Sequence, residues 1–236
     1  MKNLFFLVLA TALITFSSCK KEENSGPTIT ETKDLDAFTG VSTQSCIDAN
    51  IYYGDQQSVT LTGPEDLLKK VNIYVENGRL IMKMKNGTYL HNQNIVADIT
   101  IPRIDYVKVT GSGDVWIDQF SNLIDLELTI TGSGDIKTGI LTLSNDVDSK
   151  ITGSGQIEIQ GSADRTYIEI TGSGDYKAFG LKANTCSAEI TGSGNVEAYV
   201  NSDLDVNISG SGDVDYKGEP TIEVNISGSG EVSNKN

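Results

Sequence analysis

Residues 130–135 read Ile-Thr-Gly-Ser-Gly-Asp, and close variants of this phrase recur throughout the C-terminal half of the chain. Seven copies of Gly-Ser-Gly begin at Gly111, Gly132, Gly153, Gly172, Gly192, Gly210 and Gly228. Neighbouring copies are 18 to 21 residues apart. A Thr or Ser precedes each copy, and Asp, Asn, Gln or Glu follows it. A fixed period near 20 residues predicts a stacked repeat architecture, in which equivalent side chains form rows.

Apolar and polar residues alternate on both sides of each Gly-Ser-Gly. One apolar column lies two residues before the first glycine: Val109, Ile130, Ile151, Ile170, Ile190, Ile208 and Ile226. A second column follows the motif: Val115, Ile136, Ile157, Tyr176, Val196, Val214 and Val232. Period-two alternation is typical of half-buried strands, and glycine permits the sharp bend between them. Each repeat is therefore expected to contain a strand, a glycine corner and another strand.

This pattern predicts an all-β protein built as a right-handed parallel β-helix, or solenoid, with about seven C-terminal coils of 18–21 residues. A propeller blade needs about 40 residues, twice the repeat length. One outward column alternates in charge along successive repeats: Lys137, Glu158, Lys177 and Glu197. Stacking in register would place opposite charges side by side, which favours this arrangement.

Residues 28–108 are less periodic but also indicate β-structure. Pro64 starts a stretch that could form a helical turn, and Asn77-Gly78 lies between two alternating runs, as in a hairpin. Residues 97–101 form a further expected strand. We expect this half to cap the solenoid, so that residues 28–236 form a single domain.

The first residues indicate export. Lys2 precedes an apolar run over 4–14 that is too short to span a bilayer, as in a secretory signal peptide. The small residues before Cys19 resemble the lipobox of bacterial lipoproteins, which implies a signal peptide over 1–18, acylation of Cys19 and a lipid anchor in the outer membrane. Residues 19–27 would form a flexible tether. An unlipidated signal peptide with an incidental Cys is the alternative.

Composition argues against several functions. The net charge of −14 disfavours nucleic-acid binding, because phosphate backbones are themselves negative. The glycine motif is followed by strands, whereas a phosphate loop leads into a helix. Ser112 does not lie in a nucleophile elbow, and the only histidine, His91, lies in a polar stretch. The sequence therefore predicts no catalytic residues, no metal site and no cofactor.

Two features leave a binding role open. The acidic row after the corner, Asp114, Asp135, Asp175 and Asp213 with Gln156 and Asn195 between, is interpreted as turn chemistry, with calcium binding as the alternative. Trp116, Tyr199 and Tyr216 are candidates for an aromatic sugar platform, and Trp116 occupies the outward position. Cys186 falls in an inward column and is expected to be a core thiol; pairing with Cys46 is the alternative.

The chain resembles a known family through a set of phrases: Phe38-Thr39-Gly40-Val41, Ser58-Val59-Thr60-Leu61-Thr62-Gly63, Asn77-Gly78-Arg79-Leu80-Ile81 and the repeated Ile-Thr-Gly-Ser-Gly-Asp. They resemble the putative auto-transporter adhesin head domain, also called the GIN domain, over residues 28–233. The resemblance implies a β-helical fold in an exported protein of Gram-negative bacteria, often a lipoprotein, and supplies no catalytic residues.

The leading functional hypothesis is an outer-membrane, lipid-anchored module that binds a glycan or an extracellular protein without catalysis; its exposure at the cell surface is left open. Two alternatives remain: a polysaccharide-active β-helix enzyme, which would need converging carboxylates, and a structural envelope protein that assembles end to end or as a homodimer. The last Gly-Ser-Gly is followed only by Glu231-Val232 and a polar tail, which predicts an uncapped C-terminal end.

Overall fold

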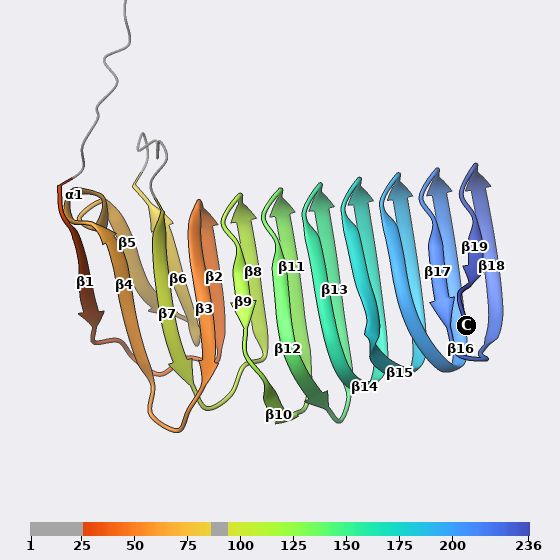
Figure 1. Ribbon diagram of the computed structural model, residues 1–236, viewed down its shortest axis with the longest axis horizontal. Coiled ribbons are helices and arrows are strands. Elements are labelled where there is room, and N and C mark those ends of the chain that lie inside the picture. The colour runs from red at the N-terminus through yellow and green to blue at the C-terminus, as the bar shows by residue number, and fades with distance from the viewer. Residues whose placement is uncertain (1–25, 86–93) are drawn as a thin grey trace, which may run out of the picture.

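The computed structural model describes residues 26–85 and 94–236, and the chain is almost entirely β. The expected signal peptide, Cys19, most of the tether and His91 lie outside the described residues. Within them, no helix has the length and apolar character needed to cross a bilayer. The strands stack as coils along one axis, giving a β-solenoid of about six turns (Figure 1). The predicted β-solenoid is confirmed, with about six turns where about seven C-terminal coils were expected.

Two sheets form the long sides of the solenoid. The pre-corner layer contains the strands that precede the corners, and the post-corner layer contains the strands that follow them. The pre-corner layer contains, in spatial order, β5 (Val71–Glu76), β6 (Arg79–Met84), β2 (Gly40–Ser45), β8 (Tyr106–Gly111), β11 (Leu126–Gly132), β13 (Asp146–Gly153), the later parts of β14 (Gln156–Gly172), β15 (Asp175–Gly192) and β16 (Asn195–Gly210), and β18 (Thr221–Gly228). The post-corner layer contains β1 (Thr28–Lys33), β4 (Ser58–Pro64), β7 (Ile95–Ile101), β3 (Ile47–Tyr53), β9 (Val115–Ile117), β12 (Ile136–Leu143), the first parts of β14, β15 and β16, β17 (Val214–Lys217) and β19 (Val232–Asn234). β10 (Phe120–Leu123) pairs with the end of β12 on a third, shorter side.

The corners stack directly on one another, as the repeat predicts. Gly132 pairs in register with Gly111 on one side and Gly153 on the other. Its φ is 130°, and a Cβ there would lie 2.3 Å from the carbonyl oxygen of Gly111. The Ser133 N–H donates to that same oxygen at 2.8 Å. Glycine is therefore required because the preceding corner occupies the space of a side chain.

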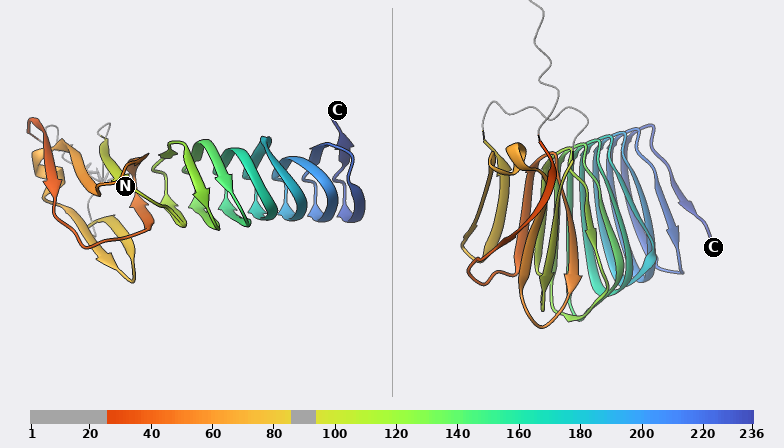
Figure 2. Two further views of the ribbon diagram at one scale, coloured as in Figure 1. Left: turned by 90° about the horizontal axis from the view of Figure 1, so that it is seen from below. Right: turned by 60° about the vertical axis from the view of Figure 1, so that its left-hand side comes forward.

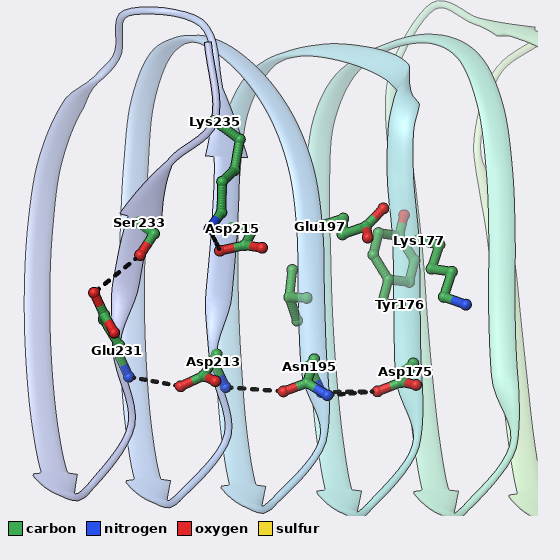
Figure 3. A pocket seen from close by; sticks show the side chains of 11 residues that line it. Asp175, Tyr176, Lys177, Asn195, Glu197, Asp213, Asp215, Glu231, Ser233 and Lys235 are labelled. Carbon is green, nitrogen blue, oxygen red and sulfur yellow. Dashed lines mark hydrogen bonds and ion pairs between the residues drawn. The ribbon is translucent and has the colours of Figure 1, made fainter.

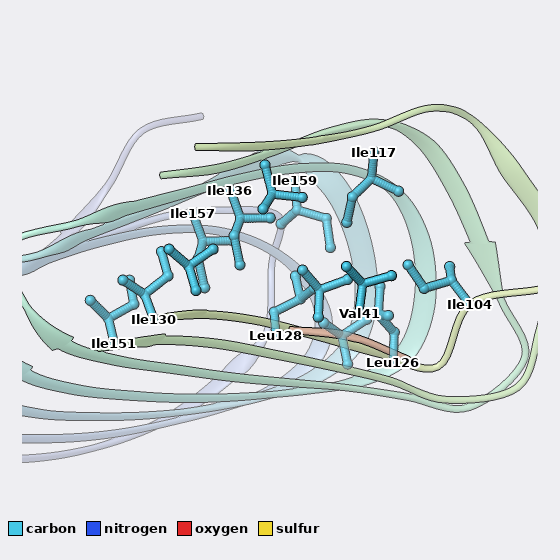
Figure 4. Close-up of a cluster of buried hydrophobic side chains, with 14 of the residues drawn as sticks. Val41, Ile104, Ile117, Leu126, Leu128, Ile130, Ile136, Ile151, Ile157 and Ile159 are labelled. Atoms are coloured by element: carbon cyan, nitrogen blue, oxygen red, sulfur yellow. The ribbon is translucent and has the colours of Figure 1, made fainter. Parts of the chain in front are cut away.

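The inward columns fill the space between the layers (Figure 4). Leu128, Ile130, Ile136 and Ile157 are fully or almost fully buried. Cys186 is 3% exposed and free, which confirms it as a core thiol, and Cys46 is also free. Burial raises the pKa of Cys186 to about 11. The two apolar columns read from the sequence therefore belong to the solenoid core, except for Ile226 and Val232 in the last coil, which are not buried.

The N-terminal half does not stack in chain order. The coil formed by β2 and β3 lies between the coil of β6 and β7 and the coil of β8 and β9. Ser45 pairs with Gly111 and has a φ of 75°, so Ser45-Cys46-Ile47-Asp48 forms an additional corner without the glycine motif. The sequence did not reveal this corner, because its partner lies 66 residues later in the chain.

Antiparallel strands cover the N-terminal end of the stack (Figure 2). β4 runs antiparallel to β7, β1 runs antiparallel to β4, and β5 forms the expected hairpin with β6. α1 (Glu65–Leu68) is the expected helical turn after Pro64, and it buries Leu67 and Leu68. At the opposite end, β18 and β19 form the last coil.

Candidate functional site

The outward side chains of the post-corner layer form a long polar surface, here called the ladder face. Its first row, here called the corner row, follows the corners, and six of its side chains each accept a backbone N–H from the next coil. The bonds link Asp48 to Asp114 at 2.9 Å, Asp114 to Asp135 at 3.0 Å, and Asp135 to Gln156 at 2.8 Å. Nearer the C-terminus they link Asp175 to Asn195 at 3.2 Å, Asn195 to Asp213 at 3.2 Å, and Asp213 to Glu231 at 2.9 Å (Figure 3).

These hydrogen bonds are the ones expected if the acidic row serves to accept backbone N–H groups at the turns. Carboxylate and amide oxygens occupy the same position because either can accept the N–H of the next corner. The row is interrupted once, at Gln156, where the Asp175 N–H donates to the Gly155 carbonyl oxygen at 3.1 Å instead. Across the described ranges 26–85 and 94–236, no group of three or more His, Cys, Asp or Glu side chains is placed to hold a metal ion.

Asp48 begins this row and is half-buried. Burial raises the pKa of its carboxyl, and the Asp114 carboxylate raises it further, although the hydrogen bond from the Asp114 N–H acts in the opposite direction. Burial also raises the pKa of the neighbouring Cys46 thiol. Asp48 was absent from the acidic row read from the sequence, because the corner that contains it lacks the glycine signature.

The second row of the ladder face contains the predicted charge alternation. Glu158 pairs in register with Lys137 on one side and Lys177 on the other, and Lys177 pairs with Glu197. The Lys137 Nζ lies 2.9 Å from the Glu158 Oε2. Both side chains are largely exposed, so the pair contributes little to stability but disfavours a register shift.

Trp116 lies in this second row, between Asn50 and Lys137. The sequence prediction of an outward Trp116 is confirmed, and its indole is half-buried because Tyr52 packs beside it, with ring centroids 5.7 Å apart. Tyr52 is 37% exposed. These two rings are here called the aromatic pair. Tyr52 was not identified from the sequence, although it belongs to an alternating strand and could have been found from the outward positions of 47–53.

Polar groups surround the aromatic pair. The Asn50 Nδ2 donates to the Asp98 Oδ1 at 2.9 Å. Burial raises the pKa of Tyr52, and the Asp98 and Asp118 carboxylates raise it further. A hollow of about 430 Å³ runs from Asp48 past Trp116 to Glu158. The N-terminal part of the ladder face thus combines two neighbouring aromatic rings, whose planes are inclined by 59°, with hydrogen-bonding groups.

A second hollow, of about 370 Å³, lies on the same face near the C-terminus (Figure 3). It contains Lys177 and Glu197 from the second row, and Lys235, whose Nζ lies 3.3 Å from the Asp215 Oδ1. Tyr199 and Tyr216 do not join the aromatic pair. Tyr199 lies beneath the Lys182 Nζ, 5.4 Å from the ring centroid, and Tyr216 packs against the core.

The family model described as "Putative auto-transporter adhesin, head GIN domain" matches residues 37–220. The chain therefore belongs to this family, as its sequence phrases indicated. No curated protein matches the chain.

Solved structures share the fold. A putative adhesin from Bacteroides fragilis NCTC 9343 superposes with a TM-score of 0.81 at 22% identity, covering 89% of this chain and 97% of that one. A putative adhesin from Parabacteroides distasonis ATCC 8503 gives 0.69 at 24% identity, covering 89% and 98%. A structure named as a putative lipid binding protein from the same strain gives 0.69 at 21% identity, also covering 89% and 98%. The family model describes an adhesin head, which supports an adhesion module of the cell surface or extracellular space, and the three solved structures show the shared fold.

Proposed function

We propose that this chain is an envelope lipoprotein, anchored in the outer membrane through Cys19, whose ladder face binds an extended glycan without catalysis. The observation that carries the proposal is the aromatic pair of Tyr52 and Trp116 beside the Asn50–Asp98 hydrogen bond. Aromatic rings present an apolar face on which a sugar ring can stack, and the neighbouring polar groups can bond its hydroxyls.

The repeat supports an extended ligand. Coils are about 4.8 Å apart, so the second row offers a regular series of donors and acceptors leading away from the aromatic pair. Carboxylates are frequent along both rows, which favours neutral or cationic glycans over sulfated or sialylated ones. The corner-row oxygens already accept backbone N–H groups, so they are poor candidates for the paired acid and base of a glycosidase.

The binding proposal is tested with a glycan array, followed by calorimetry on any hit. We expect Trp116→Ala and Tyr52→Ala each to weaken binding at least tenfold, because each removes one of the two stacking surfaces. Tyr167→Ala is the matched control: Tyr167 is 43% exposed on the pre-corner layer. Equal affinity in Trp116→Ala and Tyr167→Ala, or no bound glycan in the whole array, would contradict the proposal.

The location is tested separately. Cys19→Ala should release the chain from the membrane fraction, and protease treatment of intact cells should digest a surface-exposed protein. A chain that is protected in intact cells and digested after lysis would face the periplasm instead.

A further inference from the structure

The last coil leaves its inward side chains open at the end of the stack. Ile222, Val224 and Ile226 of β18 are 38%, 43% and 38% exposed. Their register partners on β16, Leu204, Val206 and Ile208, are exposed by 1%, 0% and 3%. The inward side chains are therefore buried in the coil of β16 but exposed in the coil of β18, because no further described coil covers β18 (Figure 2). We name this surface, Ile222, Val224 and Ile226 with the free edge of β18, the end face.

The backbone at the end face is also unpaired on one side. Among the residues that the structure describes, β18 pairs with β16 alone and β19 with β17 alone. An exposed strand edge with apolar side chains is a template for pairing with another strand. The N-terminal end is built differently, because its outermost strands run antiparallel to their neighbours: β1 in the post-corner layer, which reads Thr-Ile-Thr-Glu-Thr-Lys, and β5 in the pre-corner layer. Head-to-tail stacking of β18 on β5 of another copy is the competing arrangement, and it would give species larger than a dimer.

The sequence of β18 fits a second copy of itself. Residues 221–227 read Thr-Ile-Glu-Val-Asn-Ile-Ser, which is nearly palindromic about Val224. Antiparallel pairing centred on Val224 would place Ile222 opposite Ile226 of the partner subunit, and Glu223 opposite Asn225 of the partner subunit. Thr221 would face Ser227 of the partner subunit. No like charges meet, and all three apolar residues are covered.

The two adjacent registers that keep the apolar side chains on one face are worse. Pairing centred on residue 223 would place the Glu223 carboxylates of both copies opposite each other, which is repulsive. Pairing centred on residue 225 would place Ile222 opposite Gly228 of the partner subunit and lose an apolar contact. We therefore propose that two copies join through their end faces, with β18 antiparallel to β18 and a two-fold axis at Val224, to give a closed dimer.

This dimer has a consequence for adhesion, which rests on the proposed lipid anchor. β1 begins at Thr28 at the capped end of the stack, opposite β18 (Figure 1). In the dimer the two capped ends point away from each other. Anchored copies would therefore meet most directly from two opposing membranes, so the end face would act as a homophilic contact between cells.

The full chain with Cys19→Ser, purified without lipid, is examined by analytical ultracentrifugation over a range of concentrations. We expect a monomer–dimer equilibrium and no larger species. Val224→Lys places two like charges at the two-fold axis and should weaken dimerisation at least tenfold. Ile140→Lys is the matched control, because Ile140 is 58% exposed and lies away from the end face. A monomer at all concentrations, or a dimer insensitive to Val224→Lys, would overturn the proposal.

The register is tested by charge. Asn225→Lys places a cation opposite Glu223 of the partner subunit at two symmetric positions and should tighten the dimer several-fold at low salt, whereas Asn225→Glu should weaken it. Val224→Cys should form an intermolecular disulfide under mild oxidation, and Ile140→Cys should not. Equal effects of Lys and Glu at 225 would overturn the antiparallel register. Clumping of cells that express the wild-type chain, lost with Val224→Lys and retained with Trp116→Ala, would separate this contact from glycan binding.

Discussion

The regular coils and the β2–β3 coil build the same corner with different residues. In the regular coils each first glycine faces the carbonyl oxygen of the preceding corner, as Gly132 faces Gly111. Ser45 takes the equivalent place in the β2–β3 coil, where the ladder to β6 ends at Thr43 and Met82, two residues before Ser45. Glycine is thus demanded by the coil that precedes a corner. Where no preceding coil occupies the space of the side chain, the corner does not need glycine and the sequence differs from the repeat. Tyr52 and Asp98 come from this irregular N-terminal half.

The largest effect should come from adding a side chain to a regular corner. We expect Gly132→Ala to lower the free energy of unfolding by about 3 kcal/mol or more, because its Cβ would collide with the Gly111 oxygen at a positive φ. Ser133→Ala, at an exposed neighbour, is the control. Urea denaturation followed by circular dichroism measures both.

The opposite substitution, from serine to glycine, can be made at the corner of the β2–β3 coil. Ser45→Gly relieves a positive φ but adds freedom to the unfolded chain, so its effect should stay within about 1 kcal/mol. Tolerance of Gly132→Ala similar to that of Ser45→Gly would contradict the account of the corners.

Much of the regular half could be predicted from the sequence, because a period near 20 residues sets both the corner and the register. Trp116 was correctly placed outward by its position two residues past the corner row. The β2–β3 coil could not be placed, because its stacking partners β8 and β9 come much later in the chain, and β6 and β7 of the intervening sequence stack on its other side. Asp48 was missed for that reason, whereas Tyr52 could have been found from the alternation of residues 47–53. The last repeat predicted an uncapped C-terminal end. The near-palindromic sequence of β18 could be interpreted as a pairing site only after the structure placed Ile222, Val224 and Ile226 at the surface.

Substitutions in the corner row should have an intermediate effect on the stability of the protein. Asp135→Ala removes the acceptor of the Gln156 N–H and should destabilise the protein by about 1 kcal/mol. Gln156→Ala is the matched variant at the interruption of the row, where the Asp175 N–H uses Gly155 instead, and it should change the stability by less than about 0.5 kcal/mol. Equal losses would mean that the carboxylate row does not support the regular coils through these bonds.

The smallest effect concerns the charge at the irregular corner. The pKa of Asp48 is raised in the folded protein, first by burial and then by Asp114, so the folded state binds this proton more tightly than the unfolded state does. Ionisation of Asp48 therefore costs stability, and that cost appears as the pH rises through the folded-state pKa. Asp48→Asn keeps an acceptor oxygen and removes the charge, so we expect a gain of about 0.3 to 0.5 kcal/mol at pH 7.

The gain from Asp48→Asn should shrink as the pH falls, and vanish below the ordinary carboxyl pKa of about 3.9, where Asp48 is neutral in both states. Urea denaturation of wild type and variant at several pH values between 3 and 8 measures it. Asp34→Asn, at an exposed position, is the control. A gain that grows toward low pH would show that Asp48 is stabilised as an anion, as an acceptor of the Asp114 N–H alone would be. The carboxylate at the irregular corner would then be stabilised in the same way as the carboxylates at the regular corners. The two regions would differ only in whether the preceding coil leaves space for a side chain at the corner.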